Sequence, residues 1–189
     1  MQRRWINIFA AASLVLAAAA CDRPNGGASG PESLVAPNAA VVTYKMYSTP
    51  DGYTLLSGAA SAEASRSATL GYNGGKIAIG ASQIVIPYGA VSEQTKFTLT
   101  MVGQPYLAAK LTAVRVSDGT LVTKFAVPLP LRISYAKSVT PIPDPTQLKI
   151  YYIVDGTVKS TMPTVVDVKG QTLYTELNHF SEYSPGLDP

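Results

Sequence analysis

From residue 39 to the C-terminus, apolar and polar residues alternate in short runs separated by turn-forming residues. Alternation with a period of two places successive side chains on opposite faces of an extended chain, so each run predicts a half-buried β-strand. Asp-Gly or Asn-Gly pairs, which suit tight turns between paired strands, stand at 51–52, 73–74, 118–119 and 155–156. The predicted strands are 41–47, 53–56, 76–79, 83–86, 96–102, 111–116, 125–135, 148–154, 165–168 and 172–177.

The clearest run is KFAVPLPLRISY at 124–135, in which every second residue is apolar or aromatic. Pro128 and Pro130 lie on the opposite face and cannot donate to a strand ladder, so this run predicts an edge strand or a bulged segment. Residues 59–67, AASAEASRS, instead predict one or two helical turns or a surface loop. Together the runs predict an all-β fold, an antiparallel β-sandwich or barrel of roughly eight to ten strands.

The N-terminal segment has a different pattern, MQRRWINIFAAASLVLAAAAC, and ends in the single cysteine of the chain. Two arginines are followed by an apolar stretch too short to span a bilayer comfortably, and then by small residues. This arrangement resembles a bacterial lipoprotein signal, which implies that Cys21 carries a thioether-linked diacylglycerol and tethers the protein to a membrane outside the cytoplasm. The alternative is an ordinary secretory signal cut after Ala18 or Ala20.

The lipoprotein interpretation divides the chain into a signal peptide (1–20), a lipid-anchored flexible linker (21–38) and a β-sandwich domain (39–189). The linker is rich in Gly, Pro, Ala and Ser and offers almost nothing to bury. Removal of the signal lowers the count of basic residues from 15 to 13, against 12 acidic residues, and leaves a net charge of +1. Such a balanced charge gives no compositional support for nucleic-acid binding.

One cysteine and one histidine also limit the chemistry of the chain. An intramolecular disulfide needs a second cysteine, so we expect packing alone to stabilise the domain. A zinc or other transition-metal site of the usual kind needs more histidines or thiolates, and we expect neither a metal site nor a cofactor. No phosphate-binding glycine loop and no nucleophile-elbow motif occurs.

The segment GGKIAIGASQIVIPYGAVSEQTKFTLTMV resembles the opening of the ZU-five domain, a β-sandwich module named after zona-occludens proteins and netrin receptors. Three later segments resemble that family's following strands, and the resemblance covers residues 74–183. It implies a binding or structural module rather than an enzyme. The matching pieces are 75–79, Ile84 to Pro87, Gly89 to Val91, 95–101, 125–135, 148–156 and 177–183.

His179-Phe180-Ser181 is the sharpest candidate for chemistry. In some members of that superfamily, and in an unrelated nucleoporin domain, an HFS tripeptide cuts its own chain between Phe and Ser. The resemblance implies Ser181 as nucleophile and His179 as general base, with ester hydrolysis to follow. Strand alternation alone gives the same order, with Phe180 in the core. Because nine residues follow the bond, too few for a released domain, we expect it to stay intact.

Other candidate groups are common on β-sandwiches. The acidic residues Glu63, Glu93 and Glu176 suggest a polysaccharide-active enzyme only if two of them face each other. Asp118, Asp144, Asp155 and Asp167 lack the spacing of a calcium loop and suit Asx turns. Five tyrosines are candidates for a carbohydrate- or peptide-binding surface: Tyr44, Tyr47, Tyr72, Tyr88 and Tyr106. We therefore expect a non-enzymatic module with a protein or envelope-polysaccharide partner.

Overall fold

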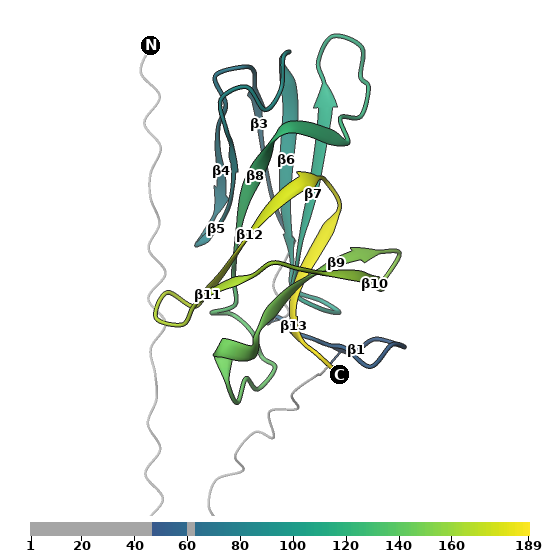
Figure 1. Ribbon diagram of the computed structural model, residues 1–189, viewed down its shortest axis with the longest axis vertical. Helices are drawn as coiled ribbons and strands as arrows, with labels where there is room; N and C mark the ends of the chain where they lie inside the picture. Colours follow the sequence, from purple (N-terminus) through teal and green to yellow (C-terminus); the bar gives the residue numbers. More distant parts are fainter. Residues whose placement is uncertain (1–46, 60–62) are drawn as a thin grey trace, which may run out of the picture. The chain divides into compact units, whose positions relative to one another are not determined.

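The computed structural model describes residues 47–59 and 63–189, which form two antiparallel β-sheets and one short 3-10 helix at Pro145–Gln147 (Figure 1). The prediction of an all-β, antiparallel β-sandwich is confirmed. The predicted signal peptide, the linker and Cys21 lie outside the described residues.

The larger sheet contains eight strands in the described part of the chain, and β13 lies at its centre. The beginning of β13 pairs with β7 and its end with β2, while β9 pairs along its other edge and carries β10. Strands β6 and β3 continue the sheet beyond β7. The strands are β1 (Tyr47–Ser48), β2 (Thr54–Leu55), β3 (Ala64–Leu70), β6 (Thr95–Val102), β7 (Ala108–Arg115), β9 (Lys149–Val154), β10 (Thr157–Met162) and β13 (Glu182–Leu187).

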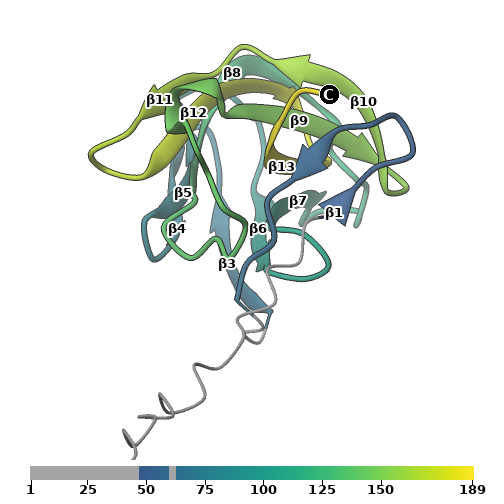
Figure 2. The same ribbon diagram turned by 90° about the horizontal axis from the view of Figure 1, so that it is seen from below.

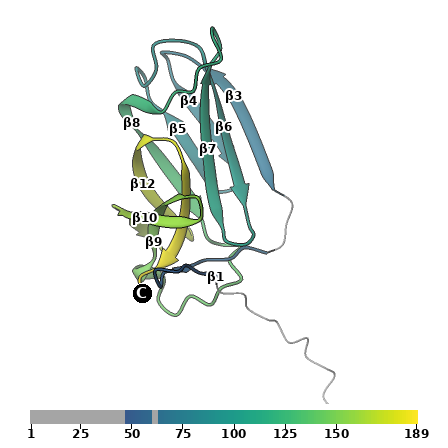
Figure 3. The same ribbon diagram turned by 90° about the vertical axis from the view of Figure 1, so that its right-hand side faces the viewer.

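The smaller sheet has the order β11-β12-β8-β5-β4. It faces β3, β6 and β7 of the larger sheet, as the side view shows (Figure 3). Seen from below, the β4–β5 hairpin and the β9–β10 hairpin lie on opposite sides of the domain (Figure 2). Its strands are β4 (Gly75–Ile79), β5 (Ser82–Ile86), β8 (Lys124–Ser134), β11 (Val165–Asp167) and β12 (Thr172–His179).

The core lies between the two sheets and follows the predicted alternation. On β8, Leu129, Leu131 and Ile133 are at most 1% exposed, whereas Pro128 and Pro130 on the opposite face are exposed. β12 and β5 add Leu173, Leu177 and Ile84 from the same sheet, and β6 supplies Phe97 and Leu99 from the other. Removal of these apolar side chains from water is the main stabilising term for a sandwich without a disulfide.

Pro128 and Pro130 of β8 have no backbone N–H group, so they need positions at which no ladder hydrogen bond is donated. β8 lies inside its sheet, so the edge-strand alternative is wrong, whereas the bulged alternative agrees with a register shift in the β8–β12 ladder between Leu177 and His179. The ladder to β5, however, consists of the pairs Gln83↔Arg132 and Ile84↔Leu131. Pro130 is paired on the β12 side only, opposite Glu176, and Pro128 lies in the stretch where the β8–β12 register shifts, so the missing N–H groups remove no bond from the ladder to β5.

Residues 59–67 were predicted as helical turns or a loop, and this is wrong for the described part, because Ala64–Leu70 form edge strand β3. The serines that suggested a loop make cross-strand contacts instead. Ser65 Oγ lies 2.9 Å from Thr100 Oγ1, and Ser67 Oγ lies 2.8 Å from Thr98 Oγ1, so each pair shares a hydrogen bond. Hydroxyl pairs on an exposed sheet face stabilise pairing without any apolar alternation.

Candidate functional site

His179, Phe180 and Ser181 lie where the chain passes from β12 in the smaller sheet to β13 in the larger one. The Phe180 ring is half-buried and packs against the core, with its centroid 4.6 Å from that of Phe125 and 5.9 Å from that of Phe97. The expectation that Phe180 packs into the core is confirmed, although it lies in the corner between two strands rather than within the last strand.

The polar groups of Ser181 join the start of β13 to its two neighbours, β9 and β7, within the larger sheet. Ser181 Oγ donates a hydrogen bond to the carbonyl oxygen of Ile153 at 3.1 Å, and the Ser181 carbonyl accepts one from the Leu111 amide at 2.9 Å. The Ser181 hydroxyl is therefore directed toward β9. A nucleophilic serine would instead donate its proton to the imidazole that acts as its base.

The imidazole of His179 has Tyr183 as its partner. Tyr183 Oη donates to the His179 carbonyl oxygen at 2.8 Å and lies 3.1 Å from Nδ1. Burial raises the pKa of Tyr183, which keeps the phenol neutral. Nδ1 of His179 therefore faces the Tyr183 hydroxyl, whereas the Ser181 hydroxyl is bonded to the Ile153 carbonyl.

None of the three residues of the tripeptide has a positive φ angle. Among the described residues other than glycine, positive φ angles occur at Asp155 and Gln171. Neither residue flanks the Phe180–Ser181 bond, so the left-handed strain that would weaken a scissile peptide is located elsewhere. The corner as observed is a packing and hydrogen-bonding joint.

The candidate acids are engaged in local structure. The pKa of Asp118 is lowered by hydrogen bonds from Thr120, and the pKa of Asp144 by hydrogen bonds from Thr146. Asp167 Oδ1 accepts from the Gly170 amide at 2.8 Å, and Asp155 begins the turn between β9 and β10. These are the Asx-turn roles that the sequence suggested.

Two of the three glutamates have distinct surroundings. Glu93 lies in the loop before β6 and faces Arg115 at 3.7 Å, whereas Glu176 lies on the exposed face of β12. Glu63 precedes β3 on the larger sheet.

Within the part of the chain that the structure describes, no three His, Cys, Asp or Glu side chains gather in a way that could hold a metal ion.

The five candidate tyrosines are separated by the fold. Tyr72 and Tyr88 are 52% and 65% exposed, with ring centroids 4.4 Å apart. Tyr106 is buried and packs against half-buried Tyr47 at 4.8 Å, in a small cluster beneath β1 and β2. Tyr44 lies outside the described residues. Of the four candidate tyrosines among the described residues, only Tyr72 and Tyr88 are exposed enough to contact a ligand.

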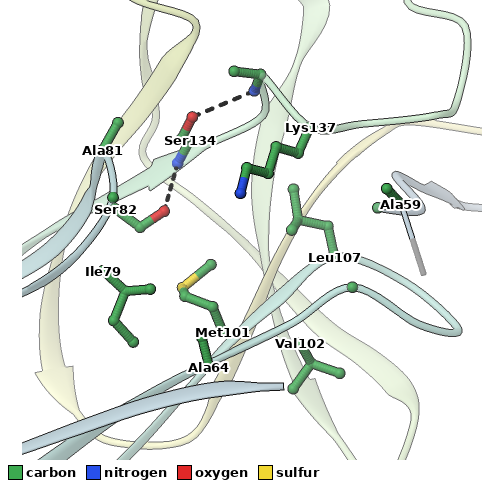
Figure 4. Close-up of a pocket in the computed structure, with 14 residues that line it drawn as sticks. Ala59, Ala64, Ile79, Ala81, Ser82, Met101, Val102, Leu107, Ser134 and Lys137 are labelled. Carbon is green, nitrogen blue, oxygen red and sulfur yellow. Dashed lines mark hydrogen bonds between the residues drawn. The ribbon is translucent and has the colours of Figure 1, made fainter. Parts of the chain in front are cut away.

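An apolar pocket of about 270 Å³ opens at the end of the sandwich where the β4–β5 turn meets the ends of β6 and β8 (Figure 4). Its walls are mostly aliphatic, with Ile79 and Met101 in contact with the core. Ser82 Oγ accepts a hydrogen bond from the Ser134 amide at 2.9 Å on one side. The further lining side chains are Ala59, Ala64, Ala81, Val102, Leu107, Ala136 and Lys137.

Among the described residues that line this pocket, Lys137 supplies the only side-chain charge. Its side chain extends from the segment after β8, and in Figure 4 its ammonium group reaches over the pocket. No carboxylate of the described residues forms an ion pair with it. An aliphatic cavity beneath an unpaired cation can receive an apolar group attached to an anion.

A second hollow, an open groove of about 690 Å³, follows the outer face of the smaller sheet. Its floor includes Pro128, Pro130 and Tyr174, and the segment between β10 and β11 forms one wall. Arg132 lies beside it, with its Nε donating to the Ala81 carbonyl at 2.8 Å and its guanidinium carbon 5.9 Å from the Tyr174 ring centroid. Arg132 thereby links β8 to the β4–β5 turn and to β12.

The pocket residues could not be predicted from the sequence, because they come from the ends of strands that are distant in the sequence. Ile79, Met101 and Lys137 share no motif or spacing, and each looks like an ordinary strand or turn residue. The alternation of apolar and polar residues stops after Tyr135, at Ala136 and Lys137. This is the one local sign in the sequence that a strand ends beside a charged residue. Only the sheet order brings these positions together.

Searches of protein-family models and of curated proteins find no match to this chain. Among the described residues, no helix has the length and apolar character that are needed to cross a membrane.

Proposed function

We propose that this protein is a membrane-tethered, extracytoplasmic β-sandwich, similar to ZU-five domains, that acts as a binding module of the bacterial envelope. The observation that carries the proposal is the apolar pocket with Lys137 at its opening. The corner at His179 and Ser181 supports the same conclusion, because both side chains have structural partners. The tether is the lipid on Cys21, followed by the linker at 21–38.

The pocket favours a small amphiphile that carries an acidic head group. The aliphatic walls exclude water from an alkyl or other apolar moiety, which gains free energy with the area that it buries. The ammonium of Lys137 attracts the head group at the opening, where no carboxylate from residues 47–59 or 63–189 forms an ion pair with it. On the pocket wall the Ser134 amide donates to Ser82 Oγ and the Ala136 amide donates to Ser134 Oγ, so these polar groups are satisfied within the protein and leave the wall apolar.

The ligand class is tested with two probes, dodecanoate and its uncharged analogue dodecanol. Lys137→Glu should weaken dodecanoate binding at least about tenfold, since attraction at the opening becomes repulsion, and leave dodecanol binding nearly unchanged. Ala136→Trp, which narrows the opening, should weaken both. Titration calorimetry of the mature protein measures the affinities, and Lys159→Glu on β10 is the matched control because Lys159 is also exposed. Equal dodecanoate affinity in the parent and all three variants would refute the proposal that the pocket binds this ligand class.

The membrane tether gives a separate prediction. Cys21→Ser removes the thiol that accepts the diacylglycerol, and the variant should leave the membrane fraction for the soluble extract. Partition of parent and variant between detergent and aqueous phases measures the change. If both proteins enter the detergent phase to the same extent, the tether is not at Cys21, whatever the pocket binds.

A further inference from the structure

Tyr72 and Tyr88 form an exposed aromatic shelf. Tyr72 lies in the turn between β3 and β4, and Tyr88 follows β5. Their rings meet edge to face at 64°, with centroids 4.4 Å apart, although both rings remain more than half exposed. Large aromatic side chains left in water beside each other are a surface feature that interaction sites share.

The shelf is held by close backbone packing. Gly74 has a φ of +69°, and a Cβ at this position would lie 2.1 Å from the Ile86 carbonyl oxygen. The Gly89 amide donates a hydrogen bond to the Tyr72 carbonyl at 2.8 Å, and the Gly74 amide donates one to the Gly71 carbonyl at 2.9 Å. The two turns are therefore joined before any ligand arrives, which reduces the conformational entropy lost on binding.

A polar hollow of about 280 Å³ adjoins the shelf, and Tyr72 forms part of its wall. Arg115 in this hollow is bound to Asp118 at 2.9 Å and faces Glu93 at 3.7 Å. Glu93 also accepts a hydrogen bond from Ser117 Oγ at 3.0 Å. Lys124 lines the same hollow, and no carboxylate in the described part of the chain pairs with it.

The hollow thus offers both donors and acceptors beside a flat apolar surface. A carboxylate and a hydroxyl stand at Glu93 and Ser92, and the unpaired ammonium of Lys124 can donate three hydrogen bonds. An alkyl chain or an apolar peptide side chain would take the Lys124 ammonium out of water without giving it a partner, at a cost in free energy. A sugar ring matches them, because its C–H face packs on an aromatic ring while its hydroxyls donate and accept.

We propose that Tyr72, Tyr88 and the adjoining hollow bind a saccharide unit of a glycan. The rings receive the apolar face of a sugar, and Lys124 and Glu93 bind its hydroxyl groups. This extends the proposed binding function to a second site, at the opposite end of β4 and β5 from the pocket beneath Lys137. The two sites are tested with different probes, so that failure at one leaves the other standing.

The test uses a panel of tetrasaccharides built from glucose, mannose, galactose, N-acetylglucosamine or glucuronate. Saturation-transfer NMR on the mature protein identifies the members that bind, and titration calorimetry measures their affinities. At least one should bind the parent, and Tyr88→Ala should weaken it at least about tenfold, since the lost ring supplies a central contact. Lys124→Ala should weaken it by a smaller factor.

Two controls make the result specific. Val165→Ala removes a side chain that is 68% exposed on β11, and Lys137→Glu alters the other pocket, so both should bind the tetrasaccharide as the parent does. Tyr88 is exposed, so Tyr88→Ala should retain the parental circular dichroism spectrum. The proposal is overturned if no member of the panel binds the parent, or if Tyr72→Ala and Tyr88→Ala both bind as tightly as the parent.

Discussion

Replacement of Phe180 by alanine is expected to lower the free energy of unfolding by about 3 kcal/mol, the lower end of the range for Phe→Ala because the side chain is half-buried. The ring is the part of the β12–β13 corner that packs against Phe125 and Phe97. Its removal leaves a cavity at the crossing between the sheets. Urea denaturation of the mature protein, followed by circular dichroism, measures the change.

Ser181→Ala is the matched control for Phe180→Ala. It removes one hydrogen bond, to the Ile153 carbonyl, and should cost about 1 kcal/mol. Both the parent and Ser181→Ala should show the intact mass of the mature chain, and the two masses should differ only by the oxygen atom that the substitution removes. A fragment of residues 181–189, present in the parent after denaturation and lost in Ser181→Ala, would instead establish self-cleavage with His179 as base.

If Phe180→Ala changes the unfolding free energy by less than about 0.5 kcal/mol, as exposed substitutions do, then the corner does not pack as observed. The two variants together separate packing from chemistry at this tripeptide. Packing depends on the ring alone, whereas self-cleavage depends on the hydroxyl and the imidazole.

The sheet strands followed from the sequence wherever one face is buried and the other is exposed. On β8, the alternation of Leu129, Leu131 and Ile133 with polar residues or proline gave both the strand and its inward face. The Asp155-Gly156 pair gave the β9–β10 turn, with φ angles of 49° and 73° at the two positions. Positive φ at both central residues is what a type I′ hairpin turn demands.

The strands β3 and β10, which the sequence pattern did not predict, lack this difference between a buried face and an exposed face. β3 is an edge strand whose outer residues are serine and threonine, and its burial pattern contains no fully buried residue. β10 pairs with β9 alone, and Val158 is the one residue of this strand that is buried. Tertiary pairing, rather than a local hydrophobic period, makes these segments extended. For that reason the serines at the start of β3 resemble those of a surface loop in the sequence.

The candidate sites were predictable only in part. Tyr72 and Tyr88 were identified as exposed aromatic candidates, but Tyr47 and Tyr106 look the same in the sequence and are packed together beneath β1 and β2. The difference is set by Gly74 and Gly89, which join two turns and leave the rings outside. The contacts of His179 were likewise invisible, because Tyr183 is a local neighbour with an ordinary strand role.

Leu131→Ala is expected to lower the free energy of unfolding by about 2–5 kcal/mol, the cost of removing a buried leucine and leaving a cavity. Leu131 is 1% exposed and, like Arg132, has strand partners on both sides of β8, in its case Thr175 on β12 and Ile84 on β5. Neighbours held by two ladders relax little into a cavity, which favours the upper part of this range. Urea denaturation is again the measurement.

Glu176→Ala on β12 is the matched control for Leu131→Ala. Glu176 pairs with Pro130, next to the pair of Thr175 with Leu131. Its side chain lies on the outer face of the sheet, away from Leu131, and is exposed. Its replacement should change the unfolding free energy by less than about 0.5 kcal/mol. A shift of one residue in the β8–β12 register would exchange the two faces, so a small effect for Leu131→Ala with a large effect for Glu176→Ala would mean that the observed pairing is wrong.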